Sequence, residues 1–512
     1  MKTLYVKMDV LTPVHIGTGE DADPFLYVIH PVSQPDNAGL HYVDLVQWIQ
    51  DSENPKRLAD IFENNRFSFV RKYIHEHLDT KIYSVGSAHV TNSMIVREYE
   101  NKLDSEDARN QLLISPGLKN SLTGNLLIPG SSVKGAIRTA VIDFLDLKYD
   151  FGLRKHSKDN RSYYSELERL LGPIRENSFK ALKVWDFEAV PEDARIVSAE
   201  EKRRKDDRPG TPKSHCEVTR SVIMDQNPYS LCSRIGIGNP QQPEDGILKV
   251  SQGRIHEKFD LANLARICRE FYQSRYRKER DKFYKQPHFD NTAKALAAIE
   301  KDILTQDDNC FVLRIGHYSH VECVTVTNNQ PQTRTGKQGT PIPHGTTRTL
   351  ANGIYPFGWV KLSLIAEDEY KAFSDTRIQR TETVLKNHEK RRFSIQKDRE
   401  KEKVREEKAA RKEQERIKAE AKRQAELAKM SPEERDIATV SDHSTSENKV
   451  MEIYRRIDNF PDDMKRKLAQ ALKDLWEEKG KWNVKKKKKQ WVKVQKIKAI
   501  LGDMHSTELE VA

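Results

Sequence analysis

The stretch Leu126–Leu145, which reads LLIPGSSVKGAIRTAVIDFL, restricts the possible folds of this chain more than any other. Three apolar residues end a short strand, and Pro129 and Gly130 break it. Ser131 or Ser132 can then cap the N-terminus of a helix. Apolar residues recur from there at helical spacing and predict one buried face, made of Val133, Ile137, Ala140, Val141, Phe144 and Leu145. The stretch therefore predicts a strand, a tight turn and a helix in succession.

Two cations stand on the other side of this predicted helix. Lys134 and Arg138 are four residues apart, one turn above each other. The free N–H groups and the positive dipole end of a helix N-terminus favour an anion, so a phosphate could bind there with help from Lys134. The simpler interpretation is a capped helix whose cations are only solvated. The spacing of a Walker phosphate loop, G-x-x-x-x-G-K-[ST], is absent.

The run IPGSSVKGAIRTAV resembles the G-[ST]-S-x-K-G-x-[IL]-R segment of the RAMP superfamily of CRISPR proteins. This resemblance implies RRM-like, ferredoxin-type domains that bind CRISPR RNA. It favours phosphate binding by Lys134 and Arg138 over a merely structural helix.

Composition predicts a polar chain of several domains. A length of 512 residues is enough for two or three domains with cores of their own. No apolar run approaches the ~20 residues of a membrane span, so we expect no membrane partner. The N-terminus has no apolar signal segment. Five scattered cysteines without C-x-x-C pairs argue against a zinc ribbon or a disulfide framework, so we expect a protein of the reducing cytoplasm.

The net charge of +11 is unevenly distributed. Residues 377–512 carry about this whole excess, and the first 376 residues are close to neutral. If the first part of the chain binds nucleic acid, it must do so through local patches of charge.

A strand at the N-terminus is predicted by apolar residues that alternate with polar ones, namely Leu4, Val6, Met8 and Val10. The following loop has the pattern L-T-P-V-H-I-G-T-G, which resembles the opening strand and loop of RAMP proteins. Its glycines, Gly17 and Gly19, permit the close approach of another backbone. His15 could contact RNA, act as an acid–base group, or simply pack at the strand end.

Residues 36–115 read as an insertion. We predict helices at Val43–Ile49, Pro55–Asn64 and Phe67–Leu78, and a strand at Val90–Tyr99. Basic and aromatic residues interleave in the third helix, which suits either a nucleic-acid surface or an ordinary amphipathic helix.

The segment Leu182–Asp186 (LKVWD) resembles the L-x-V-S-D strand of RAMP domains, with Trp185 where serine is common. Asp186 could be a catalytic carboxylate. No second acid stands at a useful short spacing, so we expect Asp186 to be structural.

Two further segments carry the resemblance in the second half of the chain. The predicted strand Cys310–Ile315 leads into RIGHYSHVE, which resembles R-[IL]-G-x-x-S-G-x-E with His320 where glycine is usual. The run TRTLANGIYPFGWV resembles the end of the fifth subunit of type III-A (Csm) CRISPR complexes. Gly353 and Gly358 would let this strand bend and its backbone approach a ligand, or the aromatic residues simply pack in a core.

The remaining segments are strongly charged. Residues 377–430 contain no glycine or proline and predict one long helix. Residues 431–512 predict a linker and a small basic helical domain, in which Lys485–Lys489 could bind phosphates or be solvated.

These observations predict an α+β fold. We expect a RAMP domain of the RRM-like, βαββαβ type at residues 1–200, with the insertion, and a second at residues 201–376. The charged helix and the small helical unit follow.

The resemblance implies a non-catalytic, CRISPR RNA-binding subunit of a type III effector complex. Such a subunit caps the filament of RAMP backbone subunits at the 3′ end of the guide RNA, meets target RNA indirectly, and supports CRISPR RNA maturation and antiviral defence. We expect no cofactor and no metal. The residues expected to contact RNA are His15, Gly17, Gly19, Gly130, Ser131, Ser132, Lys134, Arg138, Gly316, His317, Arg348, Gly353, Phe357 and Gly358.

Two alternatives remain open. Some RAMP relatives are metal-independent endoribonucleases that use a histidine as general acid or base, a part open to His15, His317 or His320. The chain could also be a different RAMP subunit, such as the one that binds the 5′ tag.

Overall fold

The computed structural model describes residues 2–31, 38–52, 55–106, 112–150, 171, 177–205, 212–238, 246–252, 255–328, 334–335, 341–342, 345–485 and 489–502. The chain forms two compact units, Met1–Ile395 and Gln396–Ala512. Each unit has a hydrophobic core of its own.

A five-stranded antiparallel sheet lies at the centre of the first unit, in the order β14-β19-β1-β11-β7. The strands are β1 (Lys2–Val10), β7 (Leu182–Val184), β11 (Ser230–Ile237), β14 (Cys310–Arg314) and β19 (Trp359–Ile365). The alternation predicted for β1 is confirmed, because Val6, Met8 and Val10 are buried while the residues between them are partly exposed.

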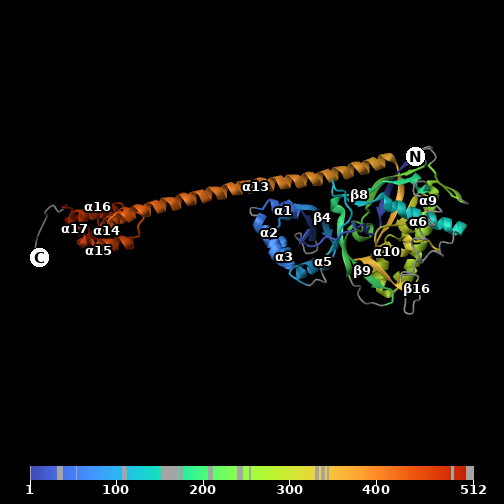
Figure 1. Cartoon of the computed structure of the whole chain (residues 1–512), viewed down its shortest axis with the longest axis horizontal. Helices are drawn as coiled ribbons and strands as arrows, with labels where there is room; N and C mark the ends of the chain where they lie inside the picture. The colour runs from blue at the N-terminus through green and yellow to red at the C-terminus, as the bar shows by residue number, and fades with distance from the viewer. Residues whose placement is uncertain are drawn as a thin grey trace. The chain divides into compact units, whose positions relative to one another are not determined.

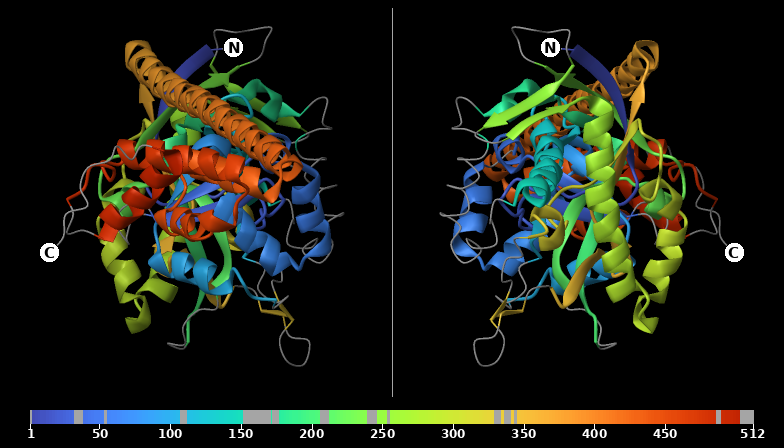
Figure 2. Two further views of the ribbon diagram at one scale, coloured as in Figure 1. Left: turned by 90° about the vertical axis from the view of Figure 1, so that its left-hand side faces the viewer. Right: turned by 90° about the vertical axis from the view of Figure 1, so that its right-hand side faces the viewer.

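Helices α6 (Gly130–Tyr149) and α9 (Leu261–Glu279) pack on one face of this sheet, which we call the inner face (Figures 1 and 2). The apolar stripe predicted for α6 is buried there, except that Phe144 is half-buried. Each fully buried aliphatic side chain stabilises the fold by about 1.5–3 kcal/mol. The opposite face of the sheet is its outer face.

A second sheet of eight strands lies beside the first and contains the order β18-β17-β9-β4-β3-β2. Two strands pair off this path, β10 with β9 and β5 with β10. The bounds are β2 (Tyr27–Pro31), β3 (Ala38–Val43), β4 (Ser84–Val90), β5 (Ile114–Ser115), β9 (Ala194–Arg203), β10 (Pro212–Thr219), β17 (Thr347–Ala351) and β18 (Tyr355–Pro356).

The predicted insertion contains helices and three strands of the second sheet, β3, β4 and β5. Its helices are α1 (Leu45–Gln50), α2 (Pro55–Asn64), α3 (Phe67–His77), α4 (Thr80–Tyr83) and α5 (Ser93–Lys102). The three predicted helices are confirmed. The strand predicted at Val90–Tyr99 is wrong, because the Asn92 side chain accepts a hydrogen bond from Met94 N and starts α5.

Shorter elements connect the two sheets. They are β6 (Leu126–Ile128), β8 (Phe187–Ala189), α8 (Val222–Asp225), β12 (Leu248–Gln252), β13 (Ile255–Phe259), α10 (Asp290–Ala297), α11 (Glu300–Ile303), α12 (Val321–Val324), β15 (Arg334–Thr335) and β16 (Pro341–Ile342).

Both sheets take strands from before and after residue 200. In the first sheet, β1 pairs with β11 on one side and with β19 on the other. A boundary near residue 200 would therefore separate strands that pair with each other. The division into residues 1–200 and 201–376 stays a prediction, and these segments do not each form a sheet alone.

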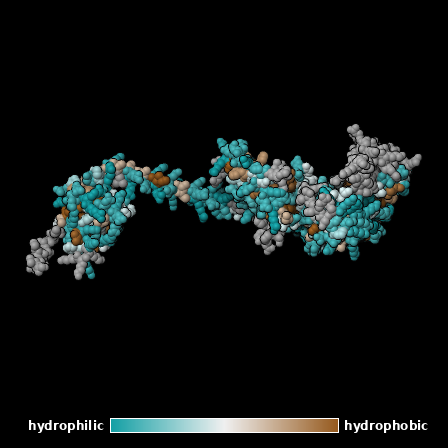
Figure 3. All heavy atoms as spheres, turned by 90° about the horizontal axis from the view of Figure 1, so that it is seen from below, coloured by the Kyte–Doolittle hydropathy of each residue, from teal (hydrophilic) through white to brown (hydrophobic). Residues whose placement is uncertain are grey.

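The second unit is helical. The long helix α13 (Glu367–Lys429) starts ten residues before the predicted position and enters this unit, followed by α14 (Pro432–Ser441), α15 (Glu447–Arg455), α16 (Asp462–Glu478) and α17 (Lys489–Leu501). Ser431 and Glu434 form a capping box that starts α14. Hydrophilic residues predominate on the face shown in Figure 3. Three of the five consecutive lysines, at positions 486–488, lie outside the described residues.

The predicted α+β fold class is confirmed, including the long charged helix and the small helical unit. Among the described helices, none is both long enough and apolar enough to cross a membrane.

Candidate nucleic-acid interface

The start of α6 is fixed by the neighbouring edge of the sheet. Gly130 N donates a hydrogen bond of 2.8 Å to Asp186 Oδ1. A Cβ atom on Gly130 would lie 2.0 Å from the carbonyl oxygen of Val184, so only glycine permits this approach. Asp186 thus has the structural role expected of it.

The predicted serine cap is wrong. The N-cap residue is Pro129, and no side chain caps the helix. Ser131 and Ser132 lie within the first turn, where Ser131 is exposed and Ser132 is partly exposed. Both serines therefore lie at the surface, and the bond from Gly130 N goes to Asp186, which lies outside the helix.

Three cations lie together near this helix start. Burial lowers the pKa of Lys134, and the positive charges of Arg138 and Lys183 lower it further. Like charges are thus concentrated beside the positive end of the α6 dipole, which favours an anion. Sequence analysis missed Lys183, because its proximity depends on the packing of β7 against α6.

A row of three side chains crosses the outer face of the sheet beside these cations. Trp185 N donates a hydrogen bond of 3.1 Å to Arg234 O, and Arg234 pairs on its other side with Tyr5 of β1. The Arg234 guanidinium lies 4.9 Å from the centre of the Trp185 ring. We call Trp185 and Arg234 the stacking pair.

The loop after β1, the turn after β14 and the turn before β19 meet in one cluster. His317 N donates to His15 O at 2.9 Å, and Gly358 N donates to Pro13 O at 2.9 Å. Gly358 has φ of 88°, and a Cβ atom there would lie 2.2 Å from the carbonyl oxygen of Ile315. The glycines of three separate motifs therefore allow three backbones to pack against one another.

His15 is buried in this cluster, with 3% of its surface exposed. Its Nδ1 donates to the carbonyl oxygen of Glu217 at 2.7 Å, which leaves Nε2 as the unprotonated nitrogen of the neutral ring. Burial lowers the pKa of His15. The hydrogen bond to Glu217 acts in the opposite direction but is the smaller effect, so the pKa stays below its ordinary value. The His317 ring lies 6.1 Å from the His15 ring and is exposed.

A lysine and a tyrosine missed by sequence analysis contact the side chain of Glu217, the residue whose carbonyl group holds His15. The buried Glu217 carboxylate pairs with Lys119 at 2.8 Å and accepts a hydrogen bond from the Tyr42 hydroxyl at 3.0 Å. No sequence pattern joins these residues, which come from β3, β10 and the segment before β6. Gly17 lies beside His15 as expected, whereas Gly19 lies at an open position with no heavy atom near its missing side chain.

Two residues expected to contact RNA are buried. Arg348 is 3% exposed and pairs with Glu279 at 2.6 Å and with Glu322 at 2.8 Å. Phe357 is 1% exposed and packs against Tyr318. Neither side chain has a surface for RNA in this fold, because Arg348 pairs with buried carboxylates and Phe357 lies in a hydrophobic cluster.

Arg348 belongs to a buried ion-pair network with Glu279 at its centre. Glu279 also pairs with Arg314 at 2.7 Å. Arg314 and Glu322 begin and end the RIGHYSHVE motif, so this motif builds the core. Gly316 and Gly353 occupy turns with positive φ, and Gly353 faces Glu200 of β9.

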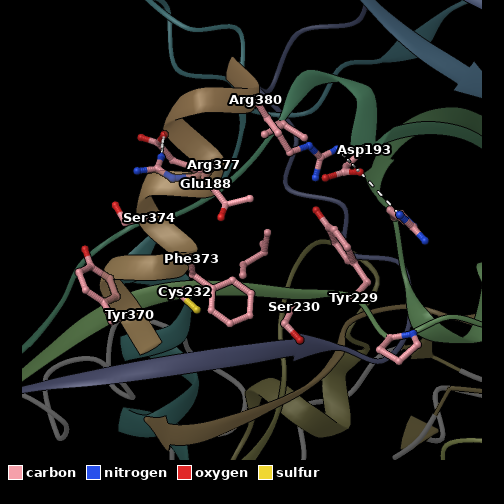
Figure 4. Close-up of a pocket in the computed structure, with 15 residues that line it drawn as sticks. Glu188, Asp193, Tyr229, Ser230, Cys232, Tyr370, Phe373, Ser374, Arg377 and Arg380 are labelled. Carbon is pink, nitrogen blue, oxygen red and sulfur yellow. Dashed lines mark hydrogen bonds and ion pairs between the residues drawn. The ribbon is translucent and has the colours of Figure 1, made fainter. Parts of the chain in front are cut away.

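The first turns of α13 lie over part of the outer face (Figure 4). Tyr370 stacks on Tyr5 with 4.8 Å between ring centres, and Arg377 pairs with Glu188. A pocket of about 280 Å³ remains between this helix and β11, with Phe373 beside Cys232. The three arginines in its wall, Arg220, Arg377 and Arg380, all face carboxylates, so the pocket has no excess positive charge. Within the described residues, no group of three or more histidine, cysteine or acidic side chains has the arrangement of a metal site.

A family model of the RAMP superfamily matches residues 7–486. A protein of Methanocaldococcus jannaschii, "CRISPR system Cms protein Csm5", is 26% identical over 200 residues. This match covers 36% of the present chain and 42% of that relative, so the chain spans less than half of the relative's length.

Two solved structures are also similar. A chain of the "Cryo-EM structure of Csm-crRNA-target RNA ternary complex in type III-A CRISPR-Cas system" is 21% identical, with a TM-score of 0.49 over 71% of this chain and 100% of that one. The "Crystal structure of T.onnurineus Csm5" is 19% identical, with a TM-score of 0.43 over 69% of this chain and 99% of that one. Because the family model spans most of the sequence, the chain belongs to the RAMP superfamily.

Proposed function

We propose that this chain is a non-catalytic, RNA-binding subunit of a type III CRISPR effector complex and caps the backbone filament at the 3′ end of the guide RNA. The observation that carries the proposal is the group of cations Lys134, Arg138 and Lys183 at the start of α6. The similarity to a Csm5 protein supports the choice of subunit. Its partners are then CRISPR RNA and the other RAMP backbone subunits, and it interacts with target RNA only indirectly. In this role it supports CRISPR RNA maturation and antiviral defence.

The proposed contacts are to the RNA backbone. A guide RNA varies in sequence and its bases must stay readable, so the subunit should bind phosphates and 2′-hydroxyls. The residues proposed for these contacts are Ser131, Ser132, Lys134 and Arg138, together with Gly19 and His317, which are exposed in the neighbouring loops. His15, Arg348 and Phe357 contribute by holding these loops in position.

The first test replaces Lys134 and Arg138 together by alanine. Loss of two charged hydrogen bonds, each worth about 1.5–3 kcal/mol, should weaken RNA binding by about a hundredfold or more. The slope of log affinity against log salt should fall by about 1.4, because two phosphate contacts are lost. Filter binding with the full-length chain and an unstructured RNA measures both quantities.

A matched control removes the same charge elsewhere. Lys294 and Lys301 are exposed on α10 and α11, and their double alanine variant should bind RNA as the native chain does. If the Lys134 and Arg138 variant is folded and retains the native affinity and slope, phosphate binding at α6 is refuted.

An endoribonuclease is the second candidate, favoured by the 6.1 Å between the His15 and His317 rings and by the contacts of Lys119 and Tyr42 with Glu217, whose carbonyl group holds His15. Against it, His15 is almost fully buried and its Nδ1 is held by a carbonyl group. We therefore predict no cleavage when pure protein is incubated in stoichiometric amounts with CRISPR RNA precursor. Cleavage that disappears in His317→Ala or His15→Ala would replace the binding role by a nuclease.

A further inference from the structure

We propose that Trp185 and Arg234, the stacking pair, hold one unpaired base of single-stranded RNA on the outer face of the five-stranded sheet. The proposal rests on the proposed RNA-binding function and extends it to a second surface beside α6. The ligand is a nucleotide whose base stacks on the pair and whose flanking phosphates meet nearby cations.

The pair is well positioned by the sheet. Trp185 continues β7 by one residue and lies opposite Arg234 of β11. The Ser233 hydroxyl lies 2.9 Å from the carbonyl oxygen of Trp185 and 2.8 Å from that of Asp186, and so it fixes the backbone at this point. The Trp185 side chain is only partly buried, so the pair remains accessible at the edge of the sheet.

The surrounding charge fits a nucleic acid. Lys183 is exposed two residues before Trp185, and side chains two apart on a strand point to the same face. The start of α6 abuts the same edge strand, because Gly130 N donates to Asp186, so the cations of α6 adjoin this face at the edge of the sheet. Asp186, the acid next to Trp185 in the chain, accepts the hydrogen bond of Gly130 N.

A stacked base fits this surface better than a protein side chain does. A guanidinium over an indole ring is a flat cationic surface, and stacking of a base on such a surface does not depend on the identity of the base. This tolerance suits a guide RNA of variable sequence.

The row ends at Tyr5, which limits the site to one base. Tyr370 of α13 stacks on Tyr5. Glu369 Oε1 lies 3.8 Å from the Nζ atom of Lys7, which is two residues further along β1. The helix thus covers the ring that would hold a second base.

The test compares Trp185→Ala, Trp185→Phe and the Lys134 and Arg138 double variant in the full-length chain. The probe is a short oligouridylate, and its affinity is measured over a range of salt. Trp185→Ala should weaken binding by about tenfold at every salt concentration, because stacking is worth roughly 1–3 kcal/mol per base and releases no counterions. Trp185→Phe should recover most of this loss, whereas the double variant should lower the salt slope.

A second measurement uses the native chain and does not depend on a variant that folds. Oligouridylate carrying one 5-iodouracil should cross-link to Trp185 on irradiation. Absence of this cross-link, or native affinity in folded Trp185→Ala, refutes the stacking site. If the double variant still loses affinity, the proposed function stands without it. If no variant changes RNA binding, both the stacking site and the proposed function are refuted. If Trp185→Ala keeps its RNA affinity but no longer co-purifies with the other RAMP subunits, this face is a protein interface and the stacking site is refuted.

Discussion

At the scale of single residues, Glu279 shows how a buried network holds the family motifs. It accepts from Arg314 and Arg348 with 5% of its own surface exposed. Burial alone would raise its pKa, but the two guanidinium groups outweigh burial and lower the pKa of Glu279 to about 2. The carboxylate is therefore stabilised by its partners in the folded chain.

We predict that Glu279→Gln destabilises the chain by about 3–5 kcal/mol, because two buried arginines lose their counter-charge. Urea unfolding at neutral pH measures this loss. The control is Glu300→Gln, which removes the partly exposed partner of Arg280 and should cost less than about 1 kcal/mol. Equal losses in the two variants would contradict the central role of Glu279.

The same carboxylate predicts a dependence on pH. Because the pKa of Glu279 is lower in the folded chain than its ordinary value of 4.5, its stabilisation is complete above about pH 5 and is lost as the pH falls from there towards 2. The urea midpoint of the native chain should therefore fall between pH 5 and pH 3 more steeply than that of Glu279→Gln. Parallel curves for the two chains would show that Glu279 does not titrate in this way.

At the scale of elements, two glycines next to the predicted interface have opposite consequences. Gly358 cannot accept a Cβ atom, because the carbonyl oxygen of Ile315 lies 2.2 Å from its position. Gly135 is exposed within α6 and has open space around its missing side chain. The first glycine is required by tertiary packing, and the second only weakens its helix.

We predict that Gly358→Ala destabilises the chain and that Gly135→Ala stabilises it by about 0.5–1 kcal/mol. Thermal unfolding of the isolated chain gives both changes, and each variant serves as the control for the other. Destabilisation by Gly135→Ala would show that α6 needs its glycine for a reason other than helix propensity.

At the scale of the whole molecule, the predicted boundary at residue 376 falls inside α13. The helix continues to contact the first unit beyond it, since Arg377 pairs with Glu188 and the Thr381 hydroxyl lies 3.3 Å from the Asn125 side chain. In the second unit, Trp476 and Trp482 are buried in that unit's own core. Contacts of the first unit therefore extend to Thr381 at least.

We predict that a chain ending at Ile395 folds with native stability, while a chain ending at Thr376 is less stable by about 1–3 kcal/mol, because it loses these polar contacts. Circular dichroism during thermal unfolding distinguishes the two. The chain ending at Ile395 also lacks most of the excess positive charge, so its RNA affinity should be lower and less dependent on salt. Equal salt slopes for this chain and the full-length protein would remove any RNA role from the second unit.

The sequence by itself determined the elements whose pattern is local. The alternation in β1, the apolar stripe of α6, the helix α9 and the uninterrupted charged helix all follow from spacing within one segment. The motifs containing Gly130, Gly316 and Gly358 likewise sufficed to indicate the family, because the three together are far more specific than any one of them.

Only the tertiary structure decided which of these residues face solvent. Arg348, Phe357 and His15 look like ligand-binding residues in sequence, yet they are buried by strands and helices distant in the chain. The stacking pair joins two strands about 50 residues apart, and no local pattern encodes such a pairing. The physical reason is that spacing specifies a face of one element, whereas burial and charge neighbours depend on which other elements pack against that face.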